Sequence, residues 1–558
     1  MAVLRHQVRP GAYLDSIVLM QLQAALCAEP GIRDSAAVMA TAANLAMLTS
    51  SAMLPARLEA CGNDDLLVVV AARDADTGDA ALGQVDALLA RRSAPAGNDD
   101  ALPPAKSLRE ARRRLPEATW AAVSVPGRWA AGVAREALEN DLNVFLYSDN
   151  VSVQDEISLK RSAAARGRLL LGPDCGTAIL GGIGFGFAND VRRGRIGLVG
   201  ASGTGLQAIT TQVHDLGAGV SHAIGIGGRD LSQPVAGAAA LRALALLAAD
   251  AATETIVLVS KPPAAAVARA LVAAALGVGK PVVVCFLATA PPIASVANLT
   301  FAPGLEQAAD LAVAQDAAAS PSQVEDALFV GGNLRALFAG GTLAFETLAQ
   351  LRLFLPVHAN LALEGVEPLT DPASSCGHTV LDMGADELTV GRLHPMIDPD
   401  LRLRRLRQEA KDPSVSTLLL DVVFGSGAEA DPAARLAPVI AELRAARPAL
   451  EVLVLAVGTN QDVQGKSEQI TRLEAAGARV YSRLSAALAR VIARTVEPLC
   501  PVADTDALAA PRVINLGLES FFHSLIEQGA TAVHVAWRPP ASGNARMTAL
   551  LAAMRSTP

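Results

Sequence analysis

Arg195-Ile-Gly-Leu-Val-Gly-Ala-Ser-Gly-Thr-Gly-Leu206 joins a strand pattern to a helix pattern through a glycine-rich turn. The apolar run 195–199 predicts a buried strand, and 206–215 has the spacing of an amphipathic helix. Glycines let a backbone approach an anion closely, and the first amides of a helix stabilise negative charge. We therefore predict a phosphate- or anion-binding loop that uses Ser202, Gly203, Thr204 and Gly205. The alternative is a helix that Ser202 or Thr204 caps without a ligand. No Walker A lysine is present, which disfavours a nucleoside triphosphate here.

The same alternation of short apolar strands and Ala-rich helices extends to both sides of this loop. Strand patterns occur at 66–70, 121–125, 144–148, 169–171, 256–259 and 281–286, and again at 417–423, 451–456 and 479–481. Such alternation predicts an α/β protein with parallel, doubly wound sheets. The predicted domains are 1–190, 191–320, a connecting Gly/Pro/His-rich segment at 321–410, and 411–558.

Composition narrows the class of protein. The 558 residues carry a net charge of −8, which argues against a nucleic-acid partner. Six cysteines without a C-x-x-C pair and eight histidines without metal spacing predict no metal site and a reducing, cytoplasmic location. The longest apolar runs are interrupted by Arg242 and Arg269, so they are expected to be buried helices and not membrane spans.

Two further loops follow strand patterns. Ile224-Gly-Ile-Gly-Gly-Arg-Asp230 offers Gly227 and Gly228 to an anion, with Arg229 as a fixed cation for phosphate or carboxylate. A local Arg229–Asp230 pair on a tight turn is the alternative. Leu171-Gly-Pro-Asp-Cys-Gly-Thr177 predicts a turn and offers Asp174 and Cys175 as substrate-binding candidates. A lone thiol is more often structural.

The second half of the chain offers a second glycine turn, Gly340-Gly341-Thr342, which opens a helix and is a further anion-binding candidate. His394, in Gly391-Arg-Leu-His-Pro-Met-Ile-Asp-Pro399, is the best single candidate for acid–base or phosphoryl chemistry, because imidazole titrates near neutral pH. An ordered His-Pro turn is the alternative. Asp421 lies at a strand position and is a candidate for substrate binding or for a structural role.

These loops resemble a known enzyme family. Gly172-Pro-Asp-Cys175, Gly194-Arg-Ile-Gly-Leu-Val199, Ser202-Gly-Thr204 and Gly225-Ile-Gly-Gly228 are similar, in order and approximate spacing, to motifs of the α subunit of succinyl-CoA synthetase. The resemblance covers roughly 110–315 and implies a CoA-binding Rossmann-like domain followed by a flavodoxin-like domain. With the second strand–helix series, we expect two flavodoxin-like parallel-sheet domains in all.

Three departures from that family matter for the chemistry. The family carries phosphate on a histidine after the strand equivalent to 281–286, where this chain reads Leu287-Ala-Thr-Ala-Pro-Pro-Ile293. A glutamate loop is replaced by Ser260-Lys-Pro-Pro263. The glycine-rich entry loop for CoA is also not evident near 10–17. CoA is therefore expected only under the ligase alternative below.

The whole chain is more similar to the FdrA family of acyl-CoA synthetase-like proteins. The match rests on the stretches 147–150, 222–230, 260–263, 340–344, 391–399 and 420–423. The resemblance implies a subunit of an oxamate carbamoyltransferase complex in allantoin degradation, with partner subunits and a functional link to a carbamate kinase. Phosphate or carbamoyl phosphate would then be the substrate at the anion loops, and Arg229 or Lys261 would hold the oxamate carboxylate.

Three functions therefore stand. The first is carbamoyl transfer between phosphate and oxamate. The second is an ADP-forming acyl-CoA synthetase that uses His394 as phospho-acceptor. The third is a non-catalytic scaffold or regulatory subunit.

Overall fold

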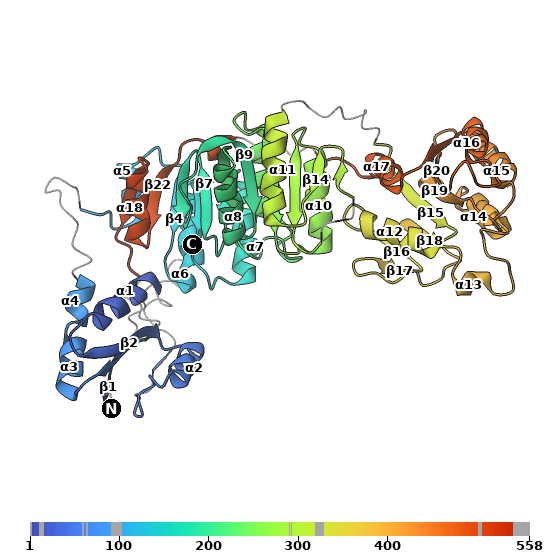
Figure 1. Cartoon of the computed structure of the whole chain (residues 1–558). Coiled ribbons are helices and arrows are strands. Elements are labelled where there is room, and N and C mark those ends of the chain that lie inside the picture. Colours follow the sequence, from blue (N-terminus) through green and yellow to red (C-terminus); the bar gives the residue numbers. More distant parts are fainter. Residues whose placement is uncertain are drawn as a thin grey trace, which may run out of the picture.

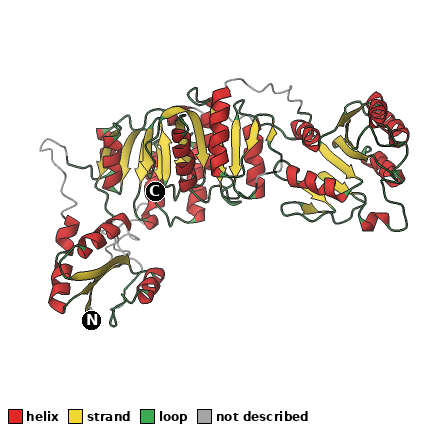
Figure 2. Ribbon diagram, viewed as in Figure 1, coloured by secondary structure: helices red, strands yellow, loops and turns green. Residues whose placement is uncertain are grey.

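The computed structural model describes residues 3–10, 16–58, 61–62, 65–90, 103–289, 291, 293–318, 329–499 and 505–539. The described chain folds around four sheets, which Figure 1 shows along an elongated molecule. Helices flank these sheets, as Figure 2 shows. In the described part of the chain, no helix has the length and apolar character that crossing a bilayer requires.

The N-terminal unit is a three-stranded antiparallel sheet in the order β1-β3-β2. Its central strand is fully buried, because helices cover both faces: Leu22 packs on one face with Val68, and Leu48 packs on the other with Leu67. The elements are β1 (Val3–Arg9), α1 (Ser16–Cys27), β2 (Ile32–Met39), α2 (Ala42–Ser50), β3 (Leu66–Ala72), α3 (Ala75–Gly83) and α4 (Val85–Ala90).

The second unit is a five-stranded parallel sheet in the order β23-β22-β4-β5-β6. Two of its strands come from the C-terminal part of the chain, and β22 pairs with β4 in the register Val513↔Trp120 to Leu516↔Val123. The elements are α5 (Leu108–Arg114), β4 (Trp120–Val123), α6 (Gly127–Glu139), β5 (Asn143–Leu146), α7 (Val153–Ala165), β6 (Leu170–Leu171), the 3-10 helix Thr505–Leu508, β22 (Arg512–Leu516), α18 (Glu519–Glu527) and β23 (Thr531–Val535).

The third unit is an eight-stranded sheet in the order β13-β14-β12-β11-β9-β10-β7-β8. Its centre, β10-β9-β11-β12, is parallel and has the 2-1-3-4 order of a flavodoxin-like sheet, with antiparallel strands at both edges. The elements are β7 (Thr177–Leu180), β8 (Ile183–Gly186), β9 (Arg193–Gly200), α8 (Gly203–Asp215), β10 (Val220–Gly225), α9 (Ala238–Ala249), β11 (Thr255–Ser260), α10 (Ala265–Leu276), β12 (Val282–Phe286), β13 (Ser295–Val296), β14 (Leu299–Phe301) and α11 (Leu305–Ala318).

The fourth unit is a seven-stranded parallel sheet in the order β17-β16-β18-β15-β19-β20-β21. The elements are β15 (Asn333–Phe338), α12 (Gly341–Leu351), β16 (Val357–Ala359), β17 (Glu367–Pro368), β18 (His378–Asp382), α13 (Asp386–Thr389), α14 (Asp400–Glu409), β19 (Val415–Val423), α15 (Pro432–Ala446), β20 (Glu451–Val457), α16 (Lys466–Ala475), β21 (Ala478–Tyr481) and α17 (Leu484–Thr495).

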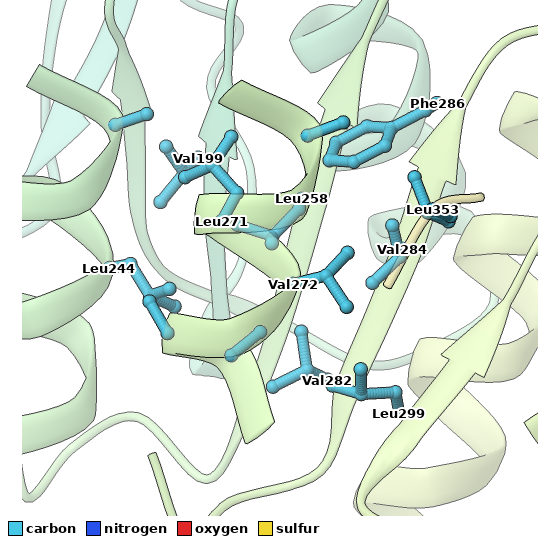
Figure 3. Close-up of a cluster of buried hydrophobic side chains, with 14 of the residues drawn as sticks. Val199, Leu244, Leu258, Leu271, Val272, Val282, Val284, Phe286, Leu299 and Leu353 are labelled. Atoms are coloured by element: carbon cyan, nitrogen blue, oxygen red, sulfur yellow. The ribbon is translucent and has the colours of Figure 1, made fainter. Parts of the chain in front are cut away.

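The third and fourth units share a hydrophobic core. Figure 3 shows the cluster between α10 and the strands of the eight-stranded sheet, to which Leu353 from the fourth unit belongs. Next to it, the rings of Phe301 and Phe354 meet edge to face with centroids 5.7 Å apart. Burial of this apolar surface holds the two sheets together.

The structure confirms the α/β class but corrects the predicted boundaries. Residues 1–190 are not one Rossmann-like domain, because the N-terminal unit is antiparallel and β7 and β8 join the next sheet. The segment 321–410 is not a connector, since its strands β15 to β18 pair with β19 in one sheet. Residues 411–558 do not form one domain, because β22 and β23 complete the sheet of β4 to β6.

Candidate functional site

The glycine loop 200–205 lies at the carboxyl end of β9 and opens helix α8. The Gly205 amide donates to Ser202 Oγ over 3.1 Å, so Ser202 caps the helix. The amides of Gly203 and Thr204 have no acceptor within the described part of the chain. The Ser202 hydroxyl therefore caps only one amide of the helix. The amides of Gly203 and Thr204, at the positive end of the helix dipole, remain available to an anion.

Loop 200–205 lies at the point where the strand order of the eight-stranded sheet reverses. From β9, the chain continues to β10 on one side of the strand, whereas the next strand, β11, pairs with β9 on its other side. Open α/β sheets bind ligands in the crevice beyond this point. Ser260 ends β11 and Lys261 follows it, so both lie at this edge of the sheet. The Ala201 amide donates to Val259 O over 3.1 Å and joins the two loops.

Arg229 and Asp230 turn to different partners, so the predicted local pair between them is wrong. Arg229 Nη2 lies 3.0 Å from Glu156 Oε2 and donates to Val151 O over 2.8 Å. Asp230 is fully buried and lies 2.6 Å from Lys160 Nζ. Arg229 is thus held in place by Glu156 and Val151, and its side chain remains 43% exposed.

The neighbouring loop 172–177 brings a carboxylate to the same place. Burial and the nearby Asp149 raise the pKa of Asp174, and the positive charges of Arg229 and Lys261 partly oppose that rise. The backbone is tight here: a Cβ on Gly227 would lie 2.4 Å from Pro173 O. The structure therefore brings Asp174, Arg229 and Lys261 together, next to the anion loop.

Cys175 does not reach this crevice. Its thiol is buried and donates to Gly225 O over 3.2 Å. Burial raises its pKa to about 12, so it carries no thiolate at neutral pH. The prediction that Cys175 binds substrate is corrected: the residue joins loop 172–177 to the end of β10.

The remaining predicted residues lie on the seven-stranded sheet. Gly340 is the N-cap of α12 and has no side-chain cap, and Thr342 lies in the first turn. Asp382 approaches the same turn, because a Cβ on Gly341 would lie 2.6 Å from its Oδ2. This carboxylate already faces the amides at the N-terminus of α12, which disfavours a second anion there.

His394 and Asp421 also belong to the unit of the seven-stranded sheet. His394 Nδ1 accepts from the Met396 amide over 3.3 Å, and a Cβ on Gly384 would lie 2.6 Å from its Nε2. Asp421 is fully buried, accepts from Ala339 N over 2.8 Å and pairs with Arg402 at 2.6 Å. Asp421 is thus a structural residue, and its predicted contact with substrate is corrected.

The structure also reveals a site that the sequence did not predict. A cleft of 710 Å³ lies between the N-terminal unit and the carboxyl ends of β22, β4 and β5. Gly517 lies in it at φ +121°, and a Cβ there would lie 2.5 Å from Ser124 Oγ. This glycine turn joins β22 to α18 at the carboxyl edge of the five-stranded sheet. The available signal was the pattern Val513-Ile-Asn-Leu-Gly517 followed by a helix.

Comparison with known proteins agrees with this division of the chain. Family models match residues 1–104 (AllF, heavy metal-associated domain), 191–288 (CoA binding domain) and 337–494 (CoA-ligase). The uncharacterised protein YahF of Escherichia coli is 38% identical over 488 residues, which are 84% of this chain and 94% of that protein. The chain belongs to the FdrA family.

The FdrA-family chain is also distantly similar to succinate–CoA ligases. The ADP-forming subunit alpha-2 of Trichomonas vaginalis is 31% identical over 165 residues, 29% of this chain and about half (52%) of that subunit. A dinucleotide-forming acetyl-coenzyme A synthetase 1 of Ca. Korarchaeum cryptofilum is 16% identical, with 67% of this chain and 82% of that chain covered and a TM-score of 0.28. The sequence matches place this FdrA-family chain among acyl-CoA synthetase-like proteins.

The N-terminal unit of the FdrA-family chain does not fit a bound heavy metal. No group of three or more His, Cys, Asp or Glu side chains with metal-site geometry occurs among the residues that the structure describes. Cys27, one of two cysteines in this unit, lies 3.1 Å from Ser35 Oγ. Within the described residues of this unit, therefore, the side chains provide no metal-ligand set of three or more such groups.

Proposed function

We propose that this chain is a subunit of a carbamoyltransferase that moves a carbamoyl group between phosphate and oxamate or a related ureido acid. One observation carries the proposal: the open N-terminus of α8 lies beside Asp174, Arg229 and Lys261, with no histidine placed to accept a phosphoryl group. The AllF-type N-terminal domain supports the same reading.

Among the described residues, no histidine lies in the crevice of the eight-stranded sheet where it could accept a phosphoryl group. Residues 287–299 contain no histidine. His222 is buried, accepts from the Gly181 amide over 3.1 Å and lies 3.4 Å from Asp250. His214 lies at the far end of α8 and accepts from the Arg192 amide over 2.9 Å. A route through phosphohistidine therefore has no residue in this crevice.

Direct transfer needs only binding and charge stabilisation. The amide nitrogen of oxamate attacks the carbonyl carbon of carbamoyl phosphate, the new C–N bond forms, and the C–O bond to phosphate breaks. Phosphate leaves with the bonding electrons, and the nitrogen loses one proton. In reverse, a phosphate oxygen attacks the carbamoyl carbon of oxalurate, and oxamate leaves as its nitrogen gains a proton. The amides of Gly203 and Thr204 would hold the phosphate in both directions.

The proton is assigned to Asp174. A carboxyl group whose pKa is raised holds a proton at a pH where an ordinary aspartate is ionised, which suits it to exchange a proton with the departing or attacking nitrogen. Arg229 and Lys261 lie close enough to influence Asp174 and would hold the carboxylate of oxamate. Asp174 would thus face the reacting nitrogen of oxamate, and the two cations would face its carboxylate.

Turnover by the native complex tests the proposal. The complex should be purified through this chain from its host and supplied with carbamoyl phosphate and oxamate. Formation of oxalurate and phosphate in equal amounts is expected. If the intact complex, with all its subunits present, gave no such turnover in either direction, carbamoyl transfer would be excluded.

A second candidate is supported by the family matches and by the cleft at Gly517. An acyl-CoA synthetase needs CoA, ATP and a phospho-acceptor, and His394 beside Asp382 is the candidate. It predicts acid-labile phosphate on the intact chain after incubation with ATP, absent in His394→Ala. An unchanged intact mass would exclude this candidate.

A further inference from the structure

Four charged side chains meet at the amino edge of the seven-stranded sheet. Glu451 is the first residue of β20, and its carboxylate lies within ion-pair distance of three guanidinium groups. Its oxygens lie 2.9 Å from Arg479 Nε, 3.0 Å from Arg490 Nη2 and 2.9 Å from Arg494 Nε. Arg479 belongs to β21, whereas the other two arginines lie one turn apart on α17. Three cations thus converge on one anion, and these four residues form the Glu451 cluster.

The Glu451 cluster carries more positive than negative charge. Burial lowers the pKa of Arg494, and Glu451 opposes that shift. Three arginines lower the pKa further, namely Arg490, Arg444 and Arg479. Glu451 is therefore the one anion among the described charges that act on Arg494, whose side chain is only 8% exposed. Like charges repel strongly where little water screens them, so a bound anion would stabilise this arrangement.

Arg479 offers hydrogen-bond donors to such an anion. It meets Glu451 through Nε, and its side chain is 61% exposed. Within the described residues, its two Nη groups have no ion-pair or hydrogen-bond partner. A guanidinium binds phosphate-like and carboxylate oxyanions through such parallel N–H groups. Arg490 meets the same carboxylate and is partly exposed, whereas Arg494 is fixed by Thr417 Oγ1 over 3.3 Å and contributes charge from the interior.

Helix α17, which carries two of these arginines, lies where the chain passes between the third and fourth units (Figure 1). The Arg494 carbonyl accepts from the amides of Val330 and Gly331 over 3.0 Å each, at the start of the fourth unit. Just after α17, the Leu499 amide donates to Ala273 O of α10, in the third unit, over 3.1 Å. The apolar face of α17 belongs to the core that the two units share. A ligand held by α17 and β21 would therefore stabilise the junction of the two units.

We propose that the Glu451 cluster binds a compact multivalent oxyanion, such as pyrophosphate or a polycarboxylate, as an effector. Arg479 binds the anion directly, and the arginines around it supply the positive field. Glu451 holds the guanidinium groups in place. The ligand is an effector and not a substrate, because the cluster lies at the amino edge of its sheet. Loop 200–205 belongs to another sheet, and the turn at Gly340 lies at the opposite edge of this one.

Calorimetric titration of the full chain tests the site, with pyrophosphate and citrate added separately at about 0.15 M chloride. Arg479→Gln removes the exposed guanidinium of the cluster. The matched control is Arg404→Gln, which removes a guanidinium that is 75% exposed on α14 of the same unit. Affinity for at least one of the two anions should fall about tenfold or more in Arg479→Gln and stay within about twofold in Arg404→Gln. Response to pyrophosphate alone identifies a phosphate ligand, and response to citrate alone a polycarboxylate.

Gly203→Pro separates this site from loop 200–205, whose amides also offer donors to an anion. The titrations are repeated in that variant, where binding that depends on Arg479 should persist, because only a donor of the α8 loop is lost. The proposal is overturned if neither anion binds to the Gly203→Pro chain, or if Arg479→Gln and Arg404→Gln bind both anions alike. Binding is measured without turnover, so these results are independent of the carbamoyltransferase assay.

Discussion

Lys160 Nζ lies 2.6 Å from Asp230 Oδ1, and both side chains are almost fully buried. The pair joins helix α7 of the five-stranded unit to the loop that follows β10 in the eight-stranded unit. Asp230 also accepts from the Ala239 and Ala240 amides, and Lys160 lies 2.8 Å from Glu156, which holds Arg229. The buried pair therefore helps to fix Glu156 and, through it, the position of Arg229 between the two units.

Removal of one partner of this pair should destabilise the protein strongly. Asp230→Ala leaves the Lys160 charge buried beside a single carboxylate, and breaking a buried pair costs about 3–5 kcal/mol. Urea denaturation of the full chain measures the loss. The matched control is Glu442→Ala, which removes an exposed pair with Arg407 at 3.0 Å and should cost less than about 1 kcal/mol. Equal effects would show that the 160–230 pair contributes no more than a surface pair.

Gly203→Pro tests the anion loop with little effect on the helix. Gly203 is the first residue of α8, where proline is well tolerated, and Ser202 before it is extended, as a residue before proline should be. The variant lacks one amide donor. Because a hydrogen bond to a charged group contributes about 1.5–3 kcal/mol, phosphate affinity measured by calorimetry should fall about 10- to 100-fold.

Gly203→Ala is the control for that variant, since it keeps the amide and its Cβ would meet only Thr177 Oγ1, at 3.6 Å. Its phosphate affinity should stay near that of the natural chain. Unchanged affinity in Gly203→Pro would place the phosphate elsewhere.

Asp174→Asn should remove one limb of the pH profile. The raised pKa of Asp174 means that the carboxyl group keeps its proton into a higher pH range than usual. Phosphorolysis needs the protonated form, so its rate should fall as pH rises through that pKa; carbamoyl transfer to oxamate needs the ionised form, so its rate should fall as pH decreases. Asparagine tolerates the left-handed backbone at φ +56° and should leave the fold intact. A variant with an unchanged pH profile would contradict the assigned role.

Gly517→Ala tests how the C-terminal strands close the first parallel sheet. The backbone of Gly517 lies at φ +121°, which strains any residue with a side chain. In addition, the alanine Cβ would lie 2.5 Å from Ser124 Oγ and 2.6 Å from the Ser124 backbone. Gly529→Ala has the same kind of strain, at φ +79°, but no atom within 4 Å. Thermal unfolding should show a loss of about 1–2 kcal/mol for Gly529→Ala and clearly more for Gly517→Ala. Equal losses would mean that the two turns do not pack as closely as the structure shows.

The sequence predicted the local elements well and the topology poorly. Loop 200–205 and its flanking strand and helix were predictable because strand, glycine turn and helix are contiguous. The pairing of Val513 with Trp120 was not, because nothing in either strand encodes a partner almost 400 positions away. Strand β15 was missed because polar Asn333 and Arg335 interrupt its apolar pattern; Arg335 is buried through ion pairs with Glu409 and Asp412.

The candidate site shows the same limit. The sequence offered Asp174, Arg229 and Lys261 in three separate loops. Asp174 follows β6 of the five-stranded sheet, whereas Arg229 and Lys261 follow β10 and β11 of the eight-stranded sheet. The structure brings the three charges close enough to influence one another. Gly340 follows β15 and obeys the same local rule, but it belongs to the seven-stranded sheet, and His394 lies in that unit in the loop after helix α13. Local pattern identifies loops at strand ends, whereas only the strand order decides which of them meet.

Phosphorolysis with labelled phosphate tests the account most directly. The native complex is incubated with oxalurate and ³²P-phosphate, without CoA or ATP, and the products and the protein are analysed for label. The account predicts labelled carbamoyl phosphate, one oxamate for each, and no label on this chain. Label retained on the chain, or a reaction that proceeds only with CoA and ATP, would contradict it.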